Sequence, residues 1–176
     1  MNFVSRLQSK ILDAHPQAIA IKGILSAALE AADPARAVQK VLRKKDNFLK
    51  INGQNFQLEK TENIYLVAFG KAAPAMASAA REVLGNALSG GIVVSKYATD
   101  HKLGNLSLHI AGHPVPDEKS VSAGKAILKL LSQTGKNDLV LFLISGGGSA
   151  LITAPVGNLS LHDLQELTSL LLGSGA

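Results

Sequence analysis

The stretch Asp138-Leu-Val-Leu-Phe-Leu-Ile-Ser-Gly-Gly-Gly-Ser149 decides how this sequence is expected to fold. Its apolar part, Leu139 to Ile144, is one of the two longest hydrophobic runs of the chain and has the length of a strand buried in a parallel sheet. Three consecutive glycines follow, and a fold keeps such a loop where the backbone approaches another group closely or adopts positive φ. The stretch therefore predicts a buried strand that ends in a glycine-rich loop.

From Thr61 onward, buried strands alternate with helices, which is typical of an α/β fold with a doubly wound, mainly parallel sheet and flanking helices. The strands are predicted at Ile64 to Phe69, Gly91 to Ser95, Leu108 to Ala111 and Leu139 to Ile144. The helices are predicted at Ala72 to Leu84, Asp117 to Gln133 and Leu161 to Leu172. Ser160 and Asp163 form a capping box for the last helix, and Gly173 is expected to cap its end.

The residues before this sheet are predicted to be mainly helical. From Asn2 to Leu42 apolar side chains recur at helical spacing, and His15-Pro16 and Asp33-Pro34 divide the segment into three helices. Phe48 to Leu58 alternates instead, and its Asn52-Gly53 pair signals a hairpin, which we expect at the edge of a sheet. The chain thus divides into a helical lead-in over 1–43, a hairpin over 47–58 and βα units over 61–176.

The composition favours an ordered protein without disulfides. The chain has 176 residues, of which 47% are hydrophobic and 18% are charged, so it can bury a substantial core. Cysteine is absent, which excludes disulfides and cysteine-based metal sites. No apolar run approaches the roughly 20 residues of a membrane span, and Met1 to Leu12 lacks the apolar core of a secretory signal. We therefore expect a cytoplasmic protein with no membrane contact.

The charge pattern does not suggest a nucleic-acid partner. The net charge is +5, and the basic residues are scattered apart from Arg43-Lys44-Lys45, with few aromatic side chains nearby to stack on bases. A small anionic substrate would suit the same sign of charge.

The residues that directly follow each strand are the first candidates for a site, because an open parallel sheet binds ligands beyond the carboxyl ends of its strands. Lys71 follows Gly70 there, at the beginning of a helix. A lysine beside the positive end of a helix is locally unfavourable unless an anion shares the site. A solvated surface lysine explains the position alone equally well. No Gly-x-x-x-x-Gly-Lys-Ser/Thr phosphate loop occurs in the sequence.

The loop Ser145-Gly146-Gly147-Gly148-Ser149 is the second candidate. Its bare backbone N–H groups and two hydroxyls make a plausible cradle for phosphate or carboxylate oxygens. A turn without a ligand is the alternative, although a turn alone requires one glycine rather than three. Leu151 replaces the last glycine of both the dinucleotide fingerprint Gly-x-Gly-x-x-Gly and the hydrolase elbow Gly-x-Ser-x-Gly, so neither motif is present.

The third candidate is Gly112-His-Pro-Val-Pro-Asp-Glu-Lys-Ser120, which follows the third strand. Asp117 is well placed to cap the next helix, and that role alone would explain it. His113 lies in a segment stiffened by two prolines and bonds either a substrate oxygen or a backbone carbonyl. A strand end separates His109 from His113, so this pair is not expected to bind a metal ion, and no metal site is predicted.

These three segments together resemble one family. The order Val67-Ala-Phe-Gly-Lys71-Ala-Ala, Gly112-His-Pro-Val-Pro-Asp-Glu-Lys-Ser120 and Leu143-Ile-Ser-Gly-Gly-Gly-Ser-Ala-Leu151 is similar to that of the glycerate 2-kinases, some of which are labelled hydroxypyruvate reductases. The resemblance implies a Rossmann-like larger domain, ATP and Mg²⁺ as cofactors, and phosphorylation of D-glycerate to 2-phosphoglycerate. It makes Lys71 the catalytic lysine, which neutralises phosphate charge during transfer. It makes Ser145 to Ser149 a phosphate- or substrate-binding loop and places His113 and Asp117 in the same cleft.

The resemblance covers only the N-terminal part of such a kinase. Family members are much longer and continue into a second domain, so the sheet is expected to be incomplete at the C-terminus and the second domain absent. Because phosphoryl transfer depends on positioned cations, this chain alone is expected to have negligible kinase activity. The alternatives are a non-catalytic fragment that binds an anion or nucleotide, and a hydroxypyruvate reductase. Uncovered apolar faces would also favour self-association.

Overall fold

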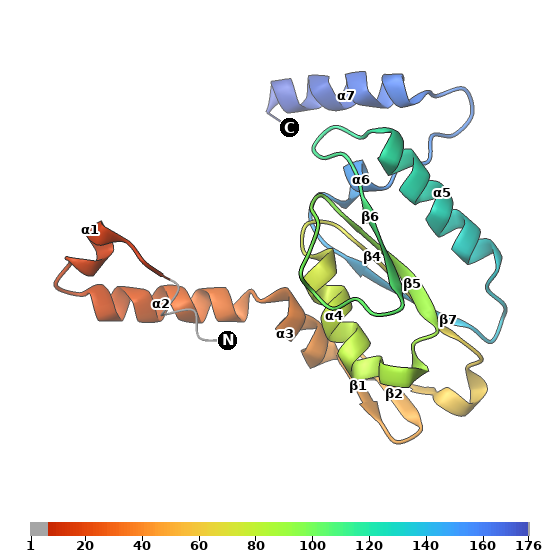
Figure 1. Cartoon of the computed structure of the whole chain (residues 1–176), viewed down its shortest axis with the longest axis horizontal. Helices are drawn as coiled ribbons and strands as arrows, with labels where there is room; N and C mark the ends of the chain where they lie inside the picture. Colours follow the sequence, from red (N-terminus) through yellow and green to blue (C-terminus); the bar gives the residue numbers. More distant parts are fainter. Residues whose placement is uncertain (1–6, 176) are drawn as a thin grey trace.

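The computed structural model describes residues 7–175, and its body is a parallel sheet with helices on both faces (Figure 1). The four strands are β4 (Ile64–Phe69), β5 (Gly90–Ser95), β6 (Leu106–Ile110) and β7 (Leu139–Ile144), and every pairing between them is parallel. The α/β fold predicted from the sequence is confirmed. Each predicted strand is found, with boundaries that differ by two residues at most.

The order of the strands creates a switch point between β4 and β7. Across the sheet the order is β6-β5-β4-β7. The chain therefore builds outward from β4 through β5 to β6, and α5 (Glu118–Ser132) then carries it back to place β7 on the other side of β4. Numbered from β4, this order is 3-2-1-4, which is that of a Rossmann-type sheet. In such sheets the connections that follow the two neighbouring strands leave toward opposite faces at the switch point, and ligands bind beyond the carboxyl ends of these strands.

Both faces of the central strand β4 are covered, which explains its apolar sequence. Leu66 and Ala68 face the cluster that contains α4 (Ala73–Leu84), whereas Val67 faces the cluster that contains α5. All three side chains are fully buried. Gly91 on β5 lies so close to the backbone of Leu66 that a Cβ at Gly91 would overlap the Leu66 carbonyl. The middle of the sheet is thus closely packed on both faces.

The predicted hairpin forms, but it does not lie at the edge of the main sheet. Strands β2 (Phe48–Ile51) and β3 (Gln54–Gln57) join through Asn52 and Gly53, both at positive φ, as the turn requires. A further strand, β1 (Leu42–Lys45), pairs with β2, so the hairpin belongs to a separate three-stranded antiparallel sheet. Leu42, which the sequence placed at the end of a helix, begins β1 because its side chain and that of Leu49 are buried in the core beside α4.

The helices before and after the sheets agree with the sequence in most respects. They are α1 (Lys10–Asp13), α2 (Ala18–Ala31), α3 (Pro34–Val41), α6 (Gly148–Leu151) and α7 (Leu161–Ser174), with 3₁₀ turns at Leu58–Lys60 and Gly85–Ala87. Asp33 caps α3 by accepting from the Arg36 N–H at 2.9 Å, and Ser160 with Asp163 forms the predicted capping box of α7. Gly173 does not cap α7, because the helix continues to Ser174 and Gly175 takes the left-handed conformation at φ 80° instead. The predicted beginning of the first helix, residues 2–6, lies outside the described residues.

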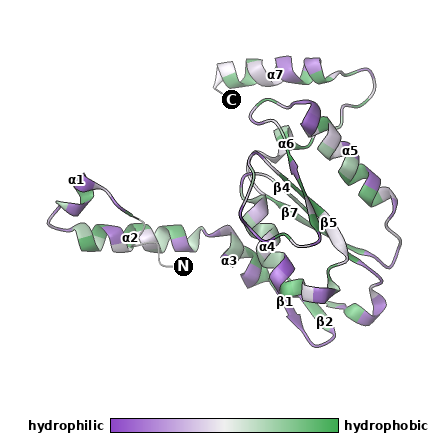
Figure 2. Ribbon diagram, in the orientation of Figure 1, coloured by the Kyte–Doolittle hydropathy of each residue, from purple (hydrophilic) through white to green (hydrophobic). Residues whose placement is uncertain are grey.

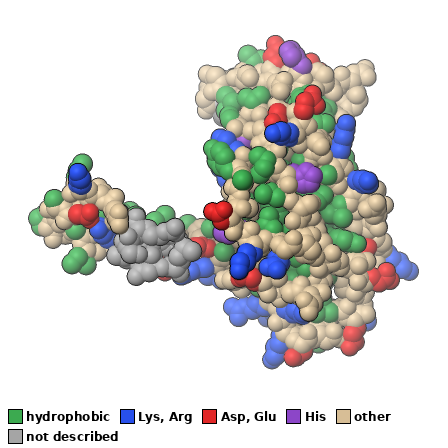
Figure 3. Space-filling view, in the orientation of Figure 1, with side chains coloured by type: hydrophobic (Ala, Val, Ile, Leu, Met, Phe, Trp, Pro, Cys, Tyr) green, Lys and Arg blue, Asp and Glu red, His purple; other side chains and the backbone are tan. Residues whose placement is uncertain are grey.

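Three apolar surfaces are left uncovered in the described part of the chain. Helices α1 and α2 project from the body as an arm, and α7 lies beside the body with no buried residue (Figures 1 and 2). Figure 3 shows hydrophobic side chains exposed on the arm and on the body beneath α7. The large apolar side chains that are more than 40% exposed include Ile19, Ile24, Leu25 and Leu29 on α2, Phe142 and Ile144 on β7, and Leu167, Leu170, Leu171 and Leu172 on α7. Within residues 7–175, no helix is long and apolar enough to cross a bilayer.

Strands β4 and β5 are largely buried, whereas α2 and α7 are largely exposed. We therefore expect the two helices to be locally less stable than the two strands. We expect the backbone amides of α2 and α7 to exchange with deuterium about 100-fold faster, or more, than those of β4 and β5, because few buried contacts hold the terminal helices. Hydrogen exchange followed by mass spectrometry at low protein concentration measures this ratio. Equal protection of α7 and β4 would contradict the prediction, and protection of α7 that rises with protein concentration would indicate self-association.

Candidate functional site

Each of the four parallel strands delivers a polar group to the carboxyl edge of the sheet. Lys71 follows β4, Lys96 follows β5, His113 follows β6, and the loop from Ser145 to Ser149 follows β7. Parallel strands end at the same edge, so these groups share one side of the molecule. Lys71 and the loop belong to the two strands that flank the switch point.

The loops after β4 and β7 are joined by direct contacts. Gly70 has φ 114°, and a Cβ there would overlap Ser145. The backbone N–H of Lys71 donates to the Gly146 carbonyl at 3.0 Å, and the N–H of Ala72 donates to the Ser145 hydroxyl oxygen at 3.0 Å. The Ser145 hydroxyl, which sequence reasoning placed on a ligand, is thus engaged in holding the two loops together. Its effect is to fix Lys71 relative to the glycines.

The glycines keep their backbone donors available. Within residues 7–175 the N–H groups of Gly146, Gly147 and Gly148 donate to no protein acceptor. Gly147 has φ 83°, and a Cβ on Gly148 would lie 2.6 Å from the ring of Phe69, so both positions require glycine. Successive free N–H groups in such a loop form a concave surface that suits an anion.

His113 reaches the glycine loop from the opposite edge strand. A Cβ added to Gly147 would lie 2.5 Å from Nε2 of His113 and 3.4 Å from Cε of Lys71. The segment after β6 therefore folds over the ends of β5 and β4, which separate β6 from β7 in the sheet. The Nδ1 atom of His113 is buried and finds no hydrogen-bond partner in the described part of the chain. A buried nitrogen without a partner is a group to which a ligand could bond.

The electrostatics of the site favour an anion. Burial lowers the pKa of His113 below its usual value of 6.5, and the positive charges of Lys71 and Lys96 lower it further. His113 is therefore neutral at neutral pH. The ion pairs that form among the described residues are Lys22 with Asp13 and Arg36 with Glu30. Neither pair includes Lys71 or Lys96, so within residues 7–175 neither lysine forms an ion pair with a carboxylate.

Asp117 shapes the segment that carries His113. One of its carboxylate oxygens accepts from the Ser120 N–H at 2.8 Å and from the Gly112 N–H at 3.0 Å, which confirms the predicted cap of α5. Burial on its own would raise the pKa of Asp117, but the hydrogen bonds from Ser120 and Gly112 outweigh it and lower the pKa. Because this oxygen already accepts from both ends of the segment, Asp117 acts on the site through the position of His113.

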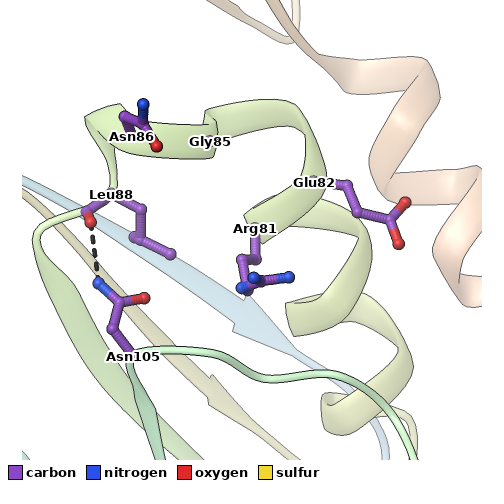
Figure 4. A pocket seen from close by; sticks show the side chains of 6 residues that line it. All are labelled: Arg81, Glu82, Gly85, Asn86, Leu88 and Asn105. Carbon is purple, nitrogen blue, oxygen red and sulfur yellow. Dashed lines mark hydrogen bonds between the residues drawn. The ribbon is translucent and has the colours of Figure 1, made fainter.

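A cavity also lies at the other edge of the sheet, where β5 and β6 begin. It has a volume of about 590 Å³ and is lined by Arg81, Glu82, Gly85, Asn86, Leu88 and Asn105 (Figure 4). Asn105 donates to the Leu88 carbonyl at 2.9 Å, and Arg81 stands in the last turn of α4, where a cation suits the negative end of the helix. These groups serve the fold at the amino ends of β5 and β6, away from Lys71 and the glycine loop.

Sequence reasoning missed Lys96 and the loop that follows it. Lys96 comes directly after a predicted strand, so the rule that identified Lys71 would also have selected it. Nothing local in the sequence shows that the charge of Lys96 acts on His113. The two residues are brought near each other by the pairing of β5 with β6.

The strand order, the free loop amides and the lysine at the switch point together define a doubly wound α/β protein whose polar groups gather at the carboxyl edge of the sheet. The chain belongs to the family described as domain of unknown function DUF4147, whose model matches residues 20–176.

Relatives and a solved structure confirm the resemblance drawn from the three motifs. The chain is 40% identical over 153 residues to glycerate 2-kinase from Pyrococcus horikoshii and 42% identical over 154 residues to D-glycerate 2-kinase from Thermotoga maritima. Each alignment covers 87% of this chain and 34% of the relative. A crystal structure of a P. horikoshii protein, 42% identical, superposes with a TM-score of 0.75 over 85% of this chain and 33% of that one. The chain thus spans about a third of the length of these relatives.

The capping role of Asp117 can be tested against a matched cap. We expect Asp117→Ala to lower the free energy of unfolding by about 1 to 2 kcal/mol, because the cap of a packed helix is lost. Asp163→Ala removes the equivalent cap of α7, which has no buried residue, and should change global stability by less than about 0.5 kcal/mol. Urea denaturation measures both values.

The loss of unfolding free energy caused by Asp117→Ala should depend on pH. The folded pKa of Asp117 lies below its usual value of 3.8, so its contribution is present at neutral pH and is lost as the pH falls through the folded pKa. The Asp117→Ala deficit should therefore shrink in strong acid. Equal deficits for the two variants at neutral pH would contradict the assignment.

Proposed function

We propose that this chain forms the phosphate-binding part of a kinase that transfers phosphate from ATP to the 2-hydroxyl of D-glycerate. The observation that carries the proposal is the meeting of Lys71, His113 and the glycine loop at the switch point between β4 and β7. The names of the relatives support the substrate. Because the chain spans about a third of their length, the complete reaction is proposed for a longer enzyme, in which residues 1–176 make up the N-terminal part of the larger domain.

The proposed chemistry is electrostatic. In phosphoryl transfer, negative charge spreads over the oxygens of the transferred group, and catalysis depends on cations and N–H donors that are already in position. Lys71 supplies the positive charge, and the free amides of Gly146 to Gly148 supply the donors. His113 is neutral, so its ring offers one donor and one acceptor to a phosphate or hydroxyl oxygen.

ATP and Mg²⁺ fit the described residues to different degrees. The free amides and Lys71 suit the phosphates of ATP. Mg²⁺ prefers oxygen ligands, chiefly carboxylates and phosphates, and within residues 7–175 no group of three candidate ligand side chains comes together. We therefore propose ATP with Mg²⁺ as the phosphate donor but assign no residue of this chain to the metal ion.

Two adjacent glycines test the role of the loop. Gly147→Ala places a methyl group against His113 at a positive φ, whereas Gly146→Ala meets nothing within 4 Å. We expect Gly147→Ala to weaken phosphate binding about tenfold, because the strain and the displaced imidazole cost on the order of 1 to 2 kcal/mol. Gly146→Ala is the control and should bind within about twofold of the unmodified chain. Calorimetry gives both affinities, and equal binding by the two variants would refute the role of Gly147.

The imidazole of His113 can report the anion directly. Bound phosphate offsets the charges of Lys71 and Lys96, so the pKa of His113 should rise toward its usual value of 6.5 when phosphate is added. Proton NMR titration of the histidines measures this rise. Lys71→Met should abolish most of it, whereas Lys125→Met, an exposed lysine on α5, should preserve it. A His113 pKa that does not respond to phosphate would refute the anion site.

An activity assay tests whether this chain is active alone. Phosphate binding without turnover, in a coupled assay with ATP, Mg²⁺ and D-glycerate, is the expected result and fits a chain that supplies one part of the active site. Turnover at the rate of a full-length relative would contradict the expectation that this chain alone is inactive.

A further inference from the structure

A small cavity at the carboxyl edge of the sheet shares Lys71 with the proposed phosphate site. It lies between the ends of β4 and β5 and has a volume of about 200 Å³. Its lining includes Lys71 just before α4, Ser95 at the end of β5, and Tyr97, Thr99 and His101 after β5. Cavities that enclose drug-sized ligands usually exceed about 300 Å³. This cavity is therefore the size for a small organic molecule rather than a nucleotide.

The lining is unusually rich in hydroxyl groups. Ser95, Tyr97 and Thr99 contribute three, and His101 adds an imidazole. The Ser95 oxygen accepts from the Tyr97 N–H at 3.4 Å, and the Thr99 oxygen accepts from the His101 N–H at 3.1 Å. Neither of these two hydroxyls donates to a protein acceptor within residues 7–175, and Ser95 is only 4% exposed. Both O–H groups therefore remain free to donate to the oxygens of a ligand.

The charge of the cavity suits an acid. Lys71 lines it, and no Asp or Glu does. Lys96 is not a lining residue, but its Nζ lies 5.1 Å from the centre of the ring of Tyr97, which is one, a distance at which a cation and an aromatic ring attract. An anionic ligand would thus meet the positive charge of Lys71 and no carboxylate among the lining residues.

Lys71 connects this cavity to the phosphate site. Its side chain lines the cavity and also passes within contact distance of the position a Cβ would take on Gly147. The cavity and the glycine loop therefore lie on either side of one lysine. A molecule in the cavity would be adjacent to a phosphate in the loop, as the two reactants of a transfer must be.

We propose that the cavity between β4 and β5 binds the acceptor, a small hydroxycarboxylate, through the Ser95 and Thr99 hydroxyls and the charge of Lys71. This inference rests on the proposed function, because Lys71 serves both the acceptor and the phosphate. It assigns Ser95, Tyr97, Thr99 and His101 to substrate recognition. The lysine then stands between the carboxylate or hydroxyl of the acceptor and the phosphate that is transferred.

The test compares two ligands on variants of the same chain. D-glycerate and inorganic phosphate are titrated separately, and binding is followed by backbone amide NMR. We expect glycerate to shift the signals of residues 95–101, and Ser95→Ala and Thr99→Val each to lower its affinity about tenfold, the usual effect of one lost hydrogen bond to a charged group. Phosphate affinity should stay within about twofold in both variants, because neither touches the glycine loop.

The control is Thr134→Val, which also removes a threonine hydroxyl bonded to backbone, at the far end of α5. It should leave both affinities unchanged. The inference is overturned if glycerate does not shift residues 95–101, or if Ser95→Ala and Thr99→Val bind glycerate like the unmodified chain. Failure of phosphate to bind, with glycerate bound in the cavity, would instead sink the proposed phosphate site and leave the acid site standing.

Discussion

The site depends above all on the contact between Gly70 and Ser145, which closes the ends of β4 and β7 against each other. Two features make that contact possible: the absence of a side chain at Gly70, and a serine hydroxyl that accepts from the Ala72 N–H and donates to the Phe69 carbonyl. Residues 73 or more positions apart in sequence are joined in this way. The lysine, the helix that begins behind it and the glycine loop thus take their positions from one junction.

The site also has to tolerate an unfavourable set of charges. Lys71 and Lys96 lie near a partly buried imidazole, and all three groups would repel one another if the imidazole were protonated. The protein resolves the conflict by keeping His113 neutral and by leaving several backbone N–H groups free beside it. Both features support the proposed binding of a ligand that brings its own negative charge. Asp117, the nearest acidic side chain of the segment, is used by the cap of α5.

Local signals in the sequence predicted the strands, the hairpin turn, the helix break at Asp33-Pro34, the caps at Asp117 and Ser160, and the three loops that carry the site. Each of these depends on residues within a few positions of one another. The separate sheet formed by β1, β2 and β3 was not predicted, because the pairing of β1 with β2 wins over the helical spacing that runs to Leu42. His113 was placed in the same cleft as Gly147 only through the family resemblance, and the use of Ser145 as a junction was missed. Both arise from strand order and crossover connections, which no window of sequence contains.

The position of β7 has a consequence for how the molecule meets other chains. Its sequence is that of an interior strand, yet within the described residues it pairs with β4 alone. One whole side of its backbone therefore presents unsatisfied donors and acceptors, and Phe142 and Ile144 stand beside them in water. An open, apolar, unprotected edge of this kind is a template on which another strand can assemble. A strand added there would satisfy those backbone groups and shield the two side chains in one step, and it would also wall in the crevice next to the glycine loop.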